Sequence, residues 1–334
     1  MTAKTETIQA APPRLIGSLR AGFDTAASHI GLILFPVALD FLIWFGPHFS
    51  LKSLLLPMID SVLQLPGMNA PELADLMKTT RQVWQAIANE FNLVTSLRTY
   101  PIGIPSLEAG QLPQHTPFGS PIVLPIHSFW SVIGIWLVLS MIGLMAGSLY
   151  FNAIARALAM RPYGNMLGES TRAALQTVFL TLGWLVLILA ISTPGFLIIT
   201  ILAFFSPALA QFGTLVIGVL VVWLLVPLLF SPHGIFLFRQ NAFTSMLTSV
   251  RVVRYLLPGT GMFFLAVVVL SQGLDILWQT PADTSWMSVI GIAGHAFITT
   301  ALIAASFVYY RDATLFVREL LNRSVASRQT PSKV

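Results

Sequence analysis

The chain has 334 residues, of which 55% are hydrophobic and 9% are charged, whereas soluble domains carry about 25% charged residues. This composition excludes an ordinary water-soluble domain and predicts a membrane protein. There is no cysteine, so thiol chemistry, cysteine-bound metals and disulfides are excluded. The net charge is +5, but the basic residues flank apolar runs, which indicates membrane topology and anionic lipid as counterion rather than nucleic acid.

The first 46 residues predict a disordered end, an interfacial helix and a span. Residues 1–13 are polar and lack the features of a secretory signal, so we expect no cleavage. In residues 14–46, apolar and polar side chains fall on opposite faces of a helix as far as Ser28, and an apolar run from Ile30 to Phe45 follows. Such a helix lies in the headgroup layer, with its arginines in water or on lipid phosphates.

The same plan recurs twice. Ser18-Leu19-Arg20 matches Ser170-Thr171-Arg172, and a looser copy, Ser249-Val250-Arg251, precedes the apolar run after Pro258. A fourth Ser-x-Arg, at Ser96, precedes no apolar run, so the motif alone does not predict an interfacial helix. We interpret the three copies as interfacial helices. Their arginines are candidate lipid-headgroup contacts: Arg20, Arg172 and Arg251.

Residues 47–127 predict an extracytoplasmic segment. Apolar residues recur at helical spacing from Leu51 to Val62 and from Leu73 to Val94. Six prolines between Tyr100 and Pro125 forbid a regular helix, so this part is expected to run extended over the membrane face. Because both helices carry an apolar stripe and no disulfide supports them, we expect a helical cap on the bundle rather than an independent domain.

Residues 128–311 predict the remaining spans and the third interfacial helix. The run from Ala173 to Phe238 has no charged side chain and is long enough for two spans. A turn at Ser206-Pro207 leaves one long helix kinked at Pro194, whereas a turn at Pro194 leaves Phe196–Phe205 as a half-helix; the long helix is favoured. The other spans are expected at Ser128–Tyr150, Pro258–Trp278 and Trp286–Tyr310.

Glycine spacing predicts how helices pack, and the distribution of basic residues predicts how the chain is oriented in the membrane. Gly143 and Gly147 predict a face that another helix backbone approaches closely. Most basic residues fall on one side, including those of the tail at 312–334, so both termini are expected in the cytoplasm. The four others lie in residues 47–127, the segment that we call the excursion: Lys52, Lys78, Arg81 and Arg98. We expect an all-α polytopic bundle of six spans in three hairpins, in the inner or plasma membrane.

Three ionisable residues fall within spans, where burial in lipid costs at least about 2.5 kcal/mol. Asp40 and Asp275 lie close to the tryptophans at the outer interface, so we expect both to be hydrated. His295 is expected near mid-membrane, bonded in neutral form across a helix interface. The alternative is that His295 pairs with Asp40 or Asp275 in a proton or cation site.

Motifs for catalysis and cofactors do not occur. The histidines lack zinc-site spacing, and the sequence has no nucleophile elbow, phosphate loop or dinucleotide fingerprint. We therefore expect no catalytic residue, no metal, no cofactor and no nucleic acid. The expected partners are membrane lipids, anionic at the cytoplasmic face, and other membrane proteins.

The three copies before apolar runs, Ser18-Leu19-Arg20, Gly168-Glu169-Ser170-Thr171-Arg172 and Ser249-Val250-Arg251, carry a resemblance. The chain resembles uncharacterised bacterial six-span families related to the membrane domain that accompanies some glycerophosphodiester phosphodiesterases, over about residues 14–50 and 128–318. The resemblance implies no settled activity and no functional residue. We expect a non-enzymatic membrane-organising, assembly or lipid-interacting protein, with a transporter or lipid-handling permease as the alternative and an intramembrane enzyme as the least favoured.

Overall fold

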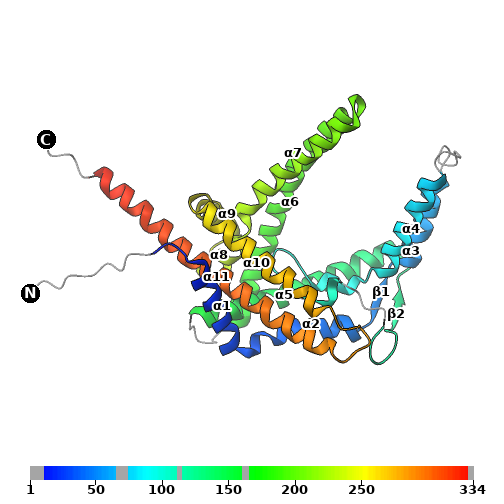
Figure 1. The fold of residues 1–334 in the computed structure, drawn as a ribbon, viewed down its shortest axis with the longest axis horizontal. Coiled ribbons are helices and arrows are strands. Elements are labelled where there is room, and N and C mark those ends of the chain that lie inside the picture. Colours follow the sequence, from blue (N-terminus) through cyan, green and yellow to red (C-terminus); the bar gives the residue numbers. More distant parts are fainter. Residues whose placement is uncertain (1–10, 65–73, 111–114, 160–164, 330–334) are drawn as a thin grey trace, which may run out of the picture. The chain divides into compact units, whose positions relative to one another are not determined.

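The computed structural model describes residues 11–64, 74–110, 115–159 and 165–329. The fold is an all-α polytopic helical bundle, as predicted. Within these residues, five helical segments are each long and apolar enough to cross a membrane. They are α5 (Phe129–Ala159), α6 (Met166–Phe205), α7 (Pro207–Leu225) with its continuation through η5 (Val226–Leu228) and α8 (Ser231–Phe238), α10 (Leu257–Trp278) and α11 (Ser288–Gln329) (Figure 1).

The chain is broken between the predicted interfacial helix and the first predicted span. Helix α1 (Leu15–Ser28) is followed by η1 (Ile30–Leu32) and α2 (Leu34–Phe45), and the two parts meet at 89°. The pair is long and apolar enough to form a sixth span only when both parts are taken together.

Helix α6 runs through Pro194 without interruption and ends at Phe205. It ends there because Ser206 caps the next helix, accepting a hydrogen bond from the Ala208 N–H at 3.2 Å. Pro207 follows at the first helical position, where its missing N–H costs nothing. The favoured single long helix is confirmed, and a separate half-helix over Phe196–Phe205 is excluded. Helices α6 and α7 then lie side by side (Figure 1).

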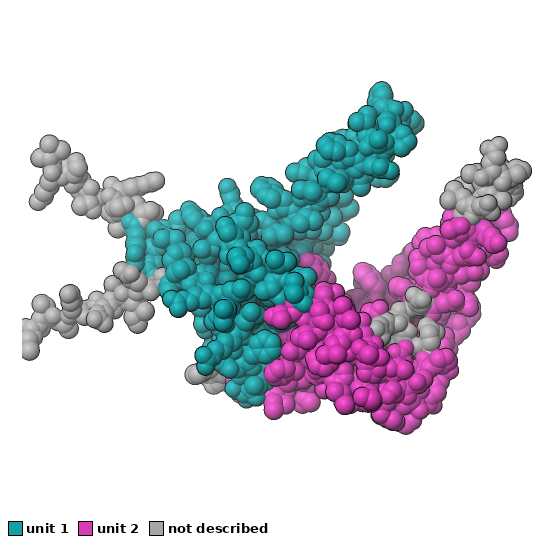
Figure 2. Space-filling model, viewed as in Figure 1, with its two compact units in different colours: residues 1–28, 151–269, 301–334 teal, residues 29–150, 270–300 magenta. Residues whose placement is uncertain are grey.

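The chain forms two compact units (Figure 2). Unit 1 comprises residues 1–28, 151–269 and 301–334, and unit 2 comprises residues 29–150 and 270–300. The boundaries between them fall inside α5, α10 and α11 and between α1 and η1. By position in the chain, every basic residue predicted to face the cytoplasm belongs to unit 1, and the four basic residues of the excursion belong to unit 2.

Unit 1 has an aromatic core and an exposed hairpin. Phe230, Phe263 and Tyr309 are buried, and the rings of Phe263 and Tyr309 stack with centroids 4.4 Å apart. Helix α8 is buried from Ser231 to Leu237. By contrast, α6 and α7 expose most of their apolar side chains. Lipid or a partner helix must cover that surface in the membrane.

The last helix is longer than predicted. Span six is predicted to end at Tyr310, whereas α11 continues through most of the basic tail to Gln329. Charged side chains in this stretch pair locally: Arg311 with Asp312 at 2.9 Å, and Arg323 with Glu319 one turn away. Pairs one turn apart support a helix that continues into polar surroundings.

Residues 47–127 contain two helices, as predicted, and these are α3 (Lys52–Leu63) and α4 (Ala74–Glu90). They pack on one another in unit 2 (Figure 1). Helix α3 has no buried residue. The described structure leaves apolar side chains of both helices exposed, among them Met58, Val62, Val83 and Trp84. Their role as a cap stays a prediction.

The proline-rich segment is packed into unit 2, and its predicted place over the membrane face stays a prediction. Ile102, Ile104 and Leu107 are buried. The segment includes the short helix η4 (Glu108–Gly110), and η3 (Leu93–Leu97) precedes it. Near its end, β2 (Val123–Pro125) pairs in parallel with β1 (His48–Ser50), which the sequence did not predict.

Gly143 and Gly147 permit a close backbone approach, but the partner is not the helix that was predicted. A Cβ atom at Gly143 would lie 2.2 Å from the carbonyl oxygen of Leu97, and one at Gly147 would lie 3.3 Å from the Cα of Gly103. The two glycines are therefore needed because the segment 97–103 lies directly against α5.

Candidate functional site

The three Ser-x-Arg helices have the same geometry in unit 1; the third is α9 (Ala242–Tyr255). At each serine, at most 2% of the residue is exposed. Each arginine two positions later is exposed. Two residues are about 200° apart around a helix, so burial of the serine turns the arginine away from the protein. The serines are Ser18, Ser170 and Ser249, and the arginines are Arg20, Arg172 and Arg251.

Small residues on the buried faces allow tight packing. In α1, Gly22 follows Ser18 by one turn, and a Cβ at Gly22 would lie 2.3 Å from the Ala301 carbonyl oxygen in α11. In α6, Ser170 accepts a hydrogen bond from Asn152 at 2.9 Å. In α9, Ser249 donates to the carbonyl oxygen of Pro227 at 2.6 Å. The serine face of each copy is therefore held by the protein itself.

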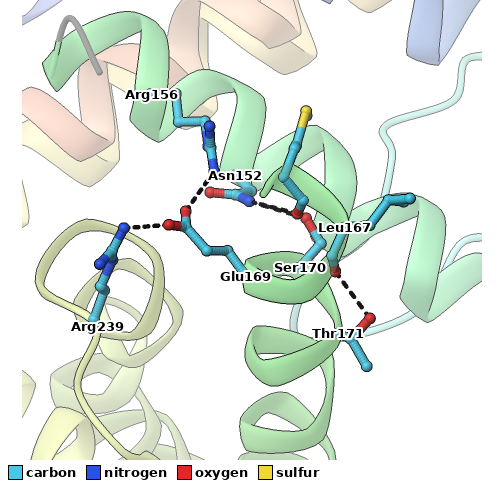
Figure 3. Close-up of polar contacts among 8 residues, drawn as sticks. Asn152, Arg156, Leu167, Glu169, Ser170, Thr171 and Arg239 are labelled. Carbon is cyan, nitrogen blue, oxygen red and sulfur yellow. Dashed lines mark hydrogen bonds and ion pairs between the residues drawn. The ribbon is translucent and has the colours of Figure 1, made fainter. Parts of the chain in front are cut away.

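Glu169, in the first turn of α6, joins three segments of unit 1 (Figure 3). Its Oε2 accepts a hydrogen bond from Arg156 in α5 at 2.7 Å, and its Oε1 accepts one from Arg239, which follows α8. Arg239 adopts a left-handed backbone conformation with φ 53°. Asn152 donates to Ser170 beside this ion pair. We call Asn152, Arg156, Glu169, Ser170 and Arg239 the Glu169 cluster.

Positive charge exceeds negative charge around Glu169. The Arg156 side chain is only 3% exposed, so its charge depends on the Glu169 carboxylate. Arg239 is 53% exposed, and Arg172 is exposed beside it, donating to the Arg239 carbonyl oxygen at 3.2 Å. A cavity of about 70 Å³ adjoins them and is also lined by Gln240. Glu169 thus secures the buried arginine while Arg172 and Arg239 remain accessible.

Exposed guanidinium groups in this position can bind phosphate. An arginine presents its N–H donors in a planar fork that matches two phosphate oxygens. Across the described residues, no group of three or more histidine, aspartate or glutamate side chains could hold a metal ion. The exposed Arg172 and Arg239 make anion binding by fixed positive charge available at the Glu169 cluster.

Asp40 is fully buried in unit 2, so the expectation that it is hydrated at the outer interface is wrong. Its Oδ1 accepts hydrogen bonds from the Ser106 hydroxyl at 2.5 Å and from the Glu108 N–H at 3.1 Å. Its Oδ2 has no hydrogen-bond partner among the described residues. The proline-rich segment covers this carboxylate, and it does so with polar groups.

Glu108 is the second buried acid of unit 2, with 6% of the residue exposed. Burial raises the pKa of its carboxyl to about 7, and the negative charges of Asp40 and Asp283 act in the same direction. Both the protonated and the ionised form of Glu108 are therefore populated near neutral pH, whereas an ordinary glutamate is ionised there.

His295 in α11 bonds across a helix interface, as predicted. Its Nδ1 lies 2.7 Å from Oδ1 of Asp275 in α10, so the predicted pairing with an acid is also present. Asp275 retains 19% exposure of its side chain, whereas His295 retains 5%. His295 lies within electrostatic range of Asp40. The structure thus brings Asp40, Asp275 and His295 into one region of unit 2.

Sequence reasoning missed the partners of these residues. Ser106 and Glu108 lie more than 60 residues from Asp40 in the chain, and no local pattern marks them. Arg156 and Arg239 were recognised only as topological charges, although Glu169 between them is the lone acidic residue near the start of a long uncharged run. A lone carboxylate among arginines is the signal that could have predicted the ion pairs.

Comparison with models of protein families, with curated proteins and with solved structures finds no match to this chain.

Proposed function

We propose that this chain is a non-enzymatic membrane protein that binds anionic lipid headgroups at the cytoplasmic face of the inner or plasma membrane. Both termini lie in the cytoplasm in this proposal. By holding lipid and presenting exposed apolar helices, the protein organises the membrane around it or assembles with partner membrane proteins.

The observation that carries the proposal is the common geometry of the three Ser-x-Arg helices. In each, the serine faces the protein and is buried, and the arginine two residues later faces outward. An arginine near an anionic membrane surface contributes about 1 kcal/mol of attraction. The arginines of the three helices are Arg20, Arg172 and Arg251. The Glu169 cluster adds Arg239 to these three, because Glu169 holds Arg239 beside Arg172.

Transport is the second candidate, and the contacts in unit 2 favour it over catalysis. A histidine paired with Asp275, near Asp40 and Glu108, provides several protonatable groups in one region. Proton-coupled transporters use groups of this kind within their spans. On this alternative, the apolar helices would enclose a path for a proton or cation.

One experiment separates the two candidates. The purified full-length protein is reconstituted into vesicles of phosphatidylcholine mixed with phosphatidylglycerol, and the lipids that it retains on extraction are counted by native mass spectrometry. We expect preferential retention of phosphatidylglycerol, and we expect the preference at each of the three helices to be about fivefold smaller when Arg20, Arg172 and Arg251 are all replaced by glutamine. The same vesicles, loaded with a pH-sensitive dye, report proton flux.

The control removes the same number of charges from exposed positions of the excursion, with Lys52, Lys78 and Arg98 replaced by glutamine. It is expected to retain phosphatidylglycerol as the unmodified protein does. Equal losses in the two triple variants would contradict the proposal. A proton flux that Asp40→Asn abolishes, with folding and lipid retention intact, would establish the transport candidate in its place.

A further inference from the structure

An apolar groove lies in unit 1 between α7, η5, α9 and the start of α10. Its volume is about 740 Å³, and its lining is almost entirely apolar. Helix α7 and the start of η5 contribute one side, where Leu215, Val219, Val222 and Val226 recur at spacings of three to four residues. Residues at this spacing form one stripe along a helix. The stripe from Leu215 to Val226 is about 16 Å long at 1.5 Å per residue, so the groove is elongated.

Gly218 widens the groove in its middle. A Cβ atom at this position would meet no other atom within 4 Å, so the glycine is not needed for protein packing. A glycine inside a helix costs about 1 kcal/mol relative to alanine. Because Gly218 lines the groove, the open space beside it adds to the room that an occupant of the groove can fill.

Positive charge marks one end of the groove. Arg254, in the last turn of α9, is the charged member of the lining, and it is exposed. It forms no ion pair within the described residues. Arg251 is three residues earlier and therefore on the same side of α9. An occupant with a long apolar part and an anionic end would satisfy both features of the groove.

We infer that the groove binds one anionic phospholipid, with an acyl chain along α7 and the phosphate against Arg254 and Arg251. This inference rests on the proposed function and names the lipid site on unit 1. A transmembrane helix of a partner protein would also bury the apolar stripe. The charge at one end of the groove favours phospholipid, because a partner helix has no need of an unpaired arginine there.

Filling the groove tests the inference. The full-length protein is reconstituted in vesicles of phosphatidylglycerol and phosphatidylcholine, extracted gently and examined by native mass spectrometry. We expect the unmodified protein to retain one phosphatidylglycerol that Gly218→Leu binds about tenfold more weakly, because the four carbon atoms of the leucine side chain fill space beside α7. An acyl chain displaced from that space loses about ten van der Waals contacts, which corresponds to about a tenfold fall in affinity. Leucine is a better helix former than glycine, so α7 is expected to stay folded.

Gly273→Leu is the matched control. Gly273 lies in α10 and is exposed, and a Cβ atom placed there would meet no other atom within 4 Å, but this glycine does not line the groove. The variant is expected to retain the lipid. Arg254→Gln is expected to lower the preference for phosphatidylglycerol over phosphatidylcholine about fivefold, and Arg254→Lys is expected to restore it.

The outcomes separate this inference from the proposed function. If Gly218→Leu and Gly273→Leu retained equal amounts of lipid, the groove would not be the site, while the lipid preference of the three Ser-x-Arg helices could still hold. If Gly218→Leu instead released a co-purifying protein and kept the lipid, the occupant would be a partner helix and the inference would be wrong.

Discussion

Replacing Glu169 with leucine is expected to destabilise the protein by about 3–5 kcal/mol, the usual cost of removing one partner from a buried ion pair. Arg156 has 3% of its side chain exposed, and Glu169 Oε2 lies 2.7 Å from it. Without the carboxylate, the guanidinium keeps a charge that neither water nor lipid can reach. Unfolding of the purified protein in detergent, followed by far-UV circular dichroism, measures the effect.

Two further variants assign the loss to the charge. Glu319→Leu removes the carboxylate of an ion pair with Arg323, which is 55% exposed, and should cost no more than about 1 kcal/mol. Replacing Arg156 with methionine together with Glu169→Leu should recover most of the stability lost by Glu169→Leu alone. If Glu169→Leu and Glu319→Leu lowered stability equally, the Glu169 cluster would not hold α5, α6 and the end of α8 together.

Gly143→Ala is expected to destabilise unit 2 by about 1–3 kcal/mol, the typical cost of overpacking. The new methyl group would lie 2.2 Å from the carbonyl oxygen of Leu97, so the segment 97–103 has to move away from α5. The reporter is limited proteolysis, since a displaced segment is cut faster. Arg98, next to Leu97, provides a trypsin site at this place.

Gly134→Ala is the comparison for this prediction. Gly134 is in the same helix, and a Cβ there meets nothing within 4 Å. Alanine is the better helix former by about 1 kcal/mol, so the substitution should be neutral or stabilising. Equal proteolysis of the two variants would show that residues 97–103 do not rest on Gly143.

Local pattern predicted most of the helices of the chain, although it did not predict that α11 continues to Gln329. The cap at Ser206 and the proline after it place the end of α6, and the period of apolar residues places α3 and α4. These signals are local because a helix forms its hydrogen bonds within a few residues. Where the proline-rich segment would pack could not be read in this way, because its contacts with α2 and α5 are made by isolated residues far apart in the chain.

In the candidate site, too, features set by local pattern could be predicted, whereas contacts between residues far apart in the chain could not. Helical periodicity predicted that Arg20 is exposed on the polar face of α1, but it placed Ser18 on that same face, whereas the structure buries this serine. The contact of His295 with Asp275 was the alternative in the sequence analysis, because the position of Asp275 beside Trp278 favoured a hydrated carboxylate instead. The burial of Asp40 could not be predicted, since Ser106 and Glu108 lie in a segment without regular periodicity.

Cysteine labelling tests the central claim, that the three Ser-x-Arg helices share the cytoplasmic face, most directly. The chain has no native cysteine, so a single cysteine can be placed at an exposed residue within each helix, with Gly17→Cys, Thr171→Cys and Thr244→Cys. Ser120→Cys and Thr284→Cys, also at exposed residues, serve for the opposite face. We predict that an impermeant maleimide labels the last two in intact cells and the first three only after the membrane is permeabilised. Labelling of any of the first three in intact cells would place its arginine away from the cytoplasmic lipid surface and contradict the account.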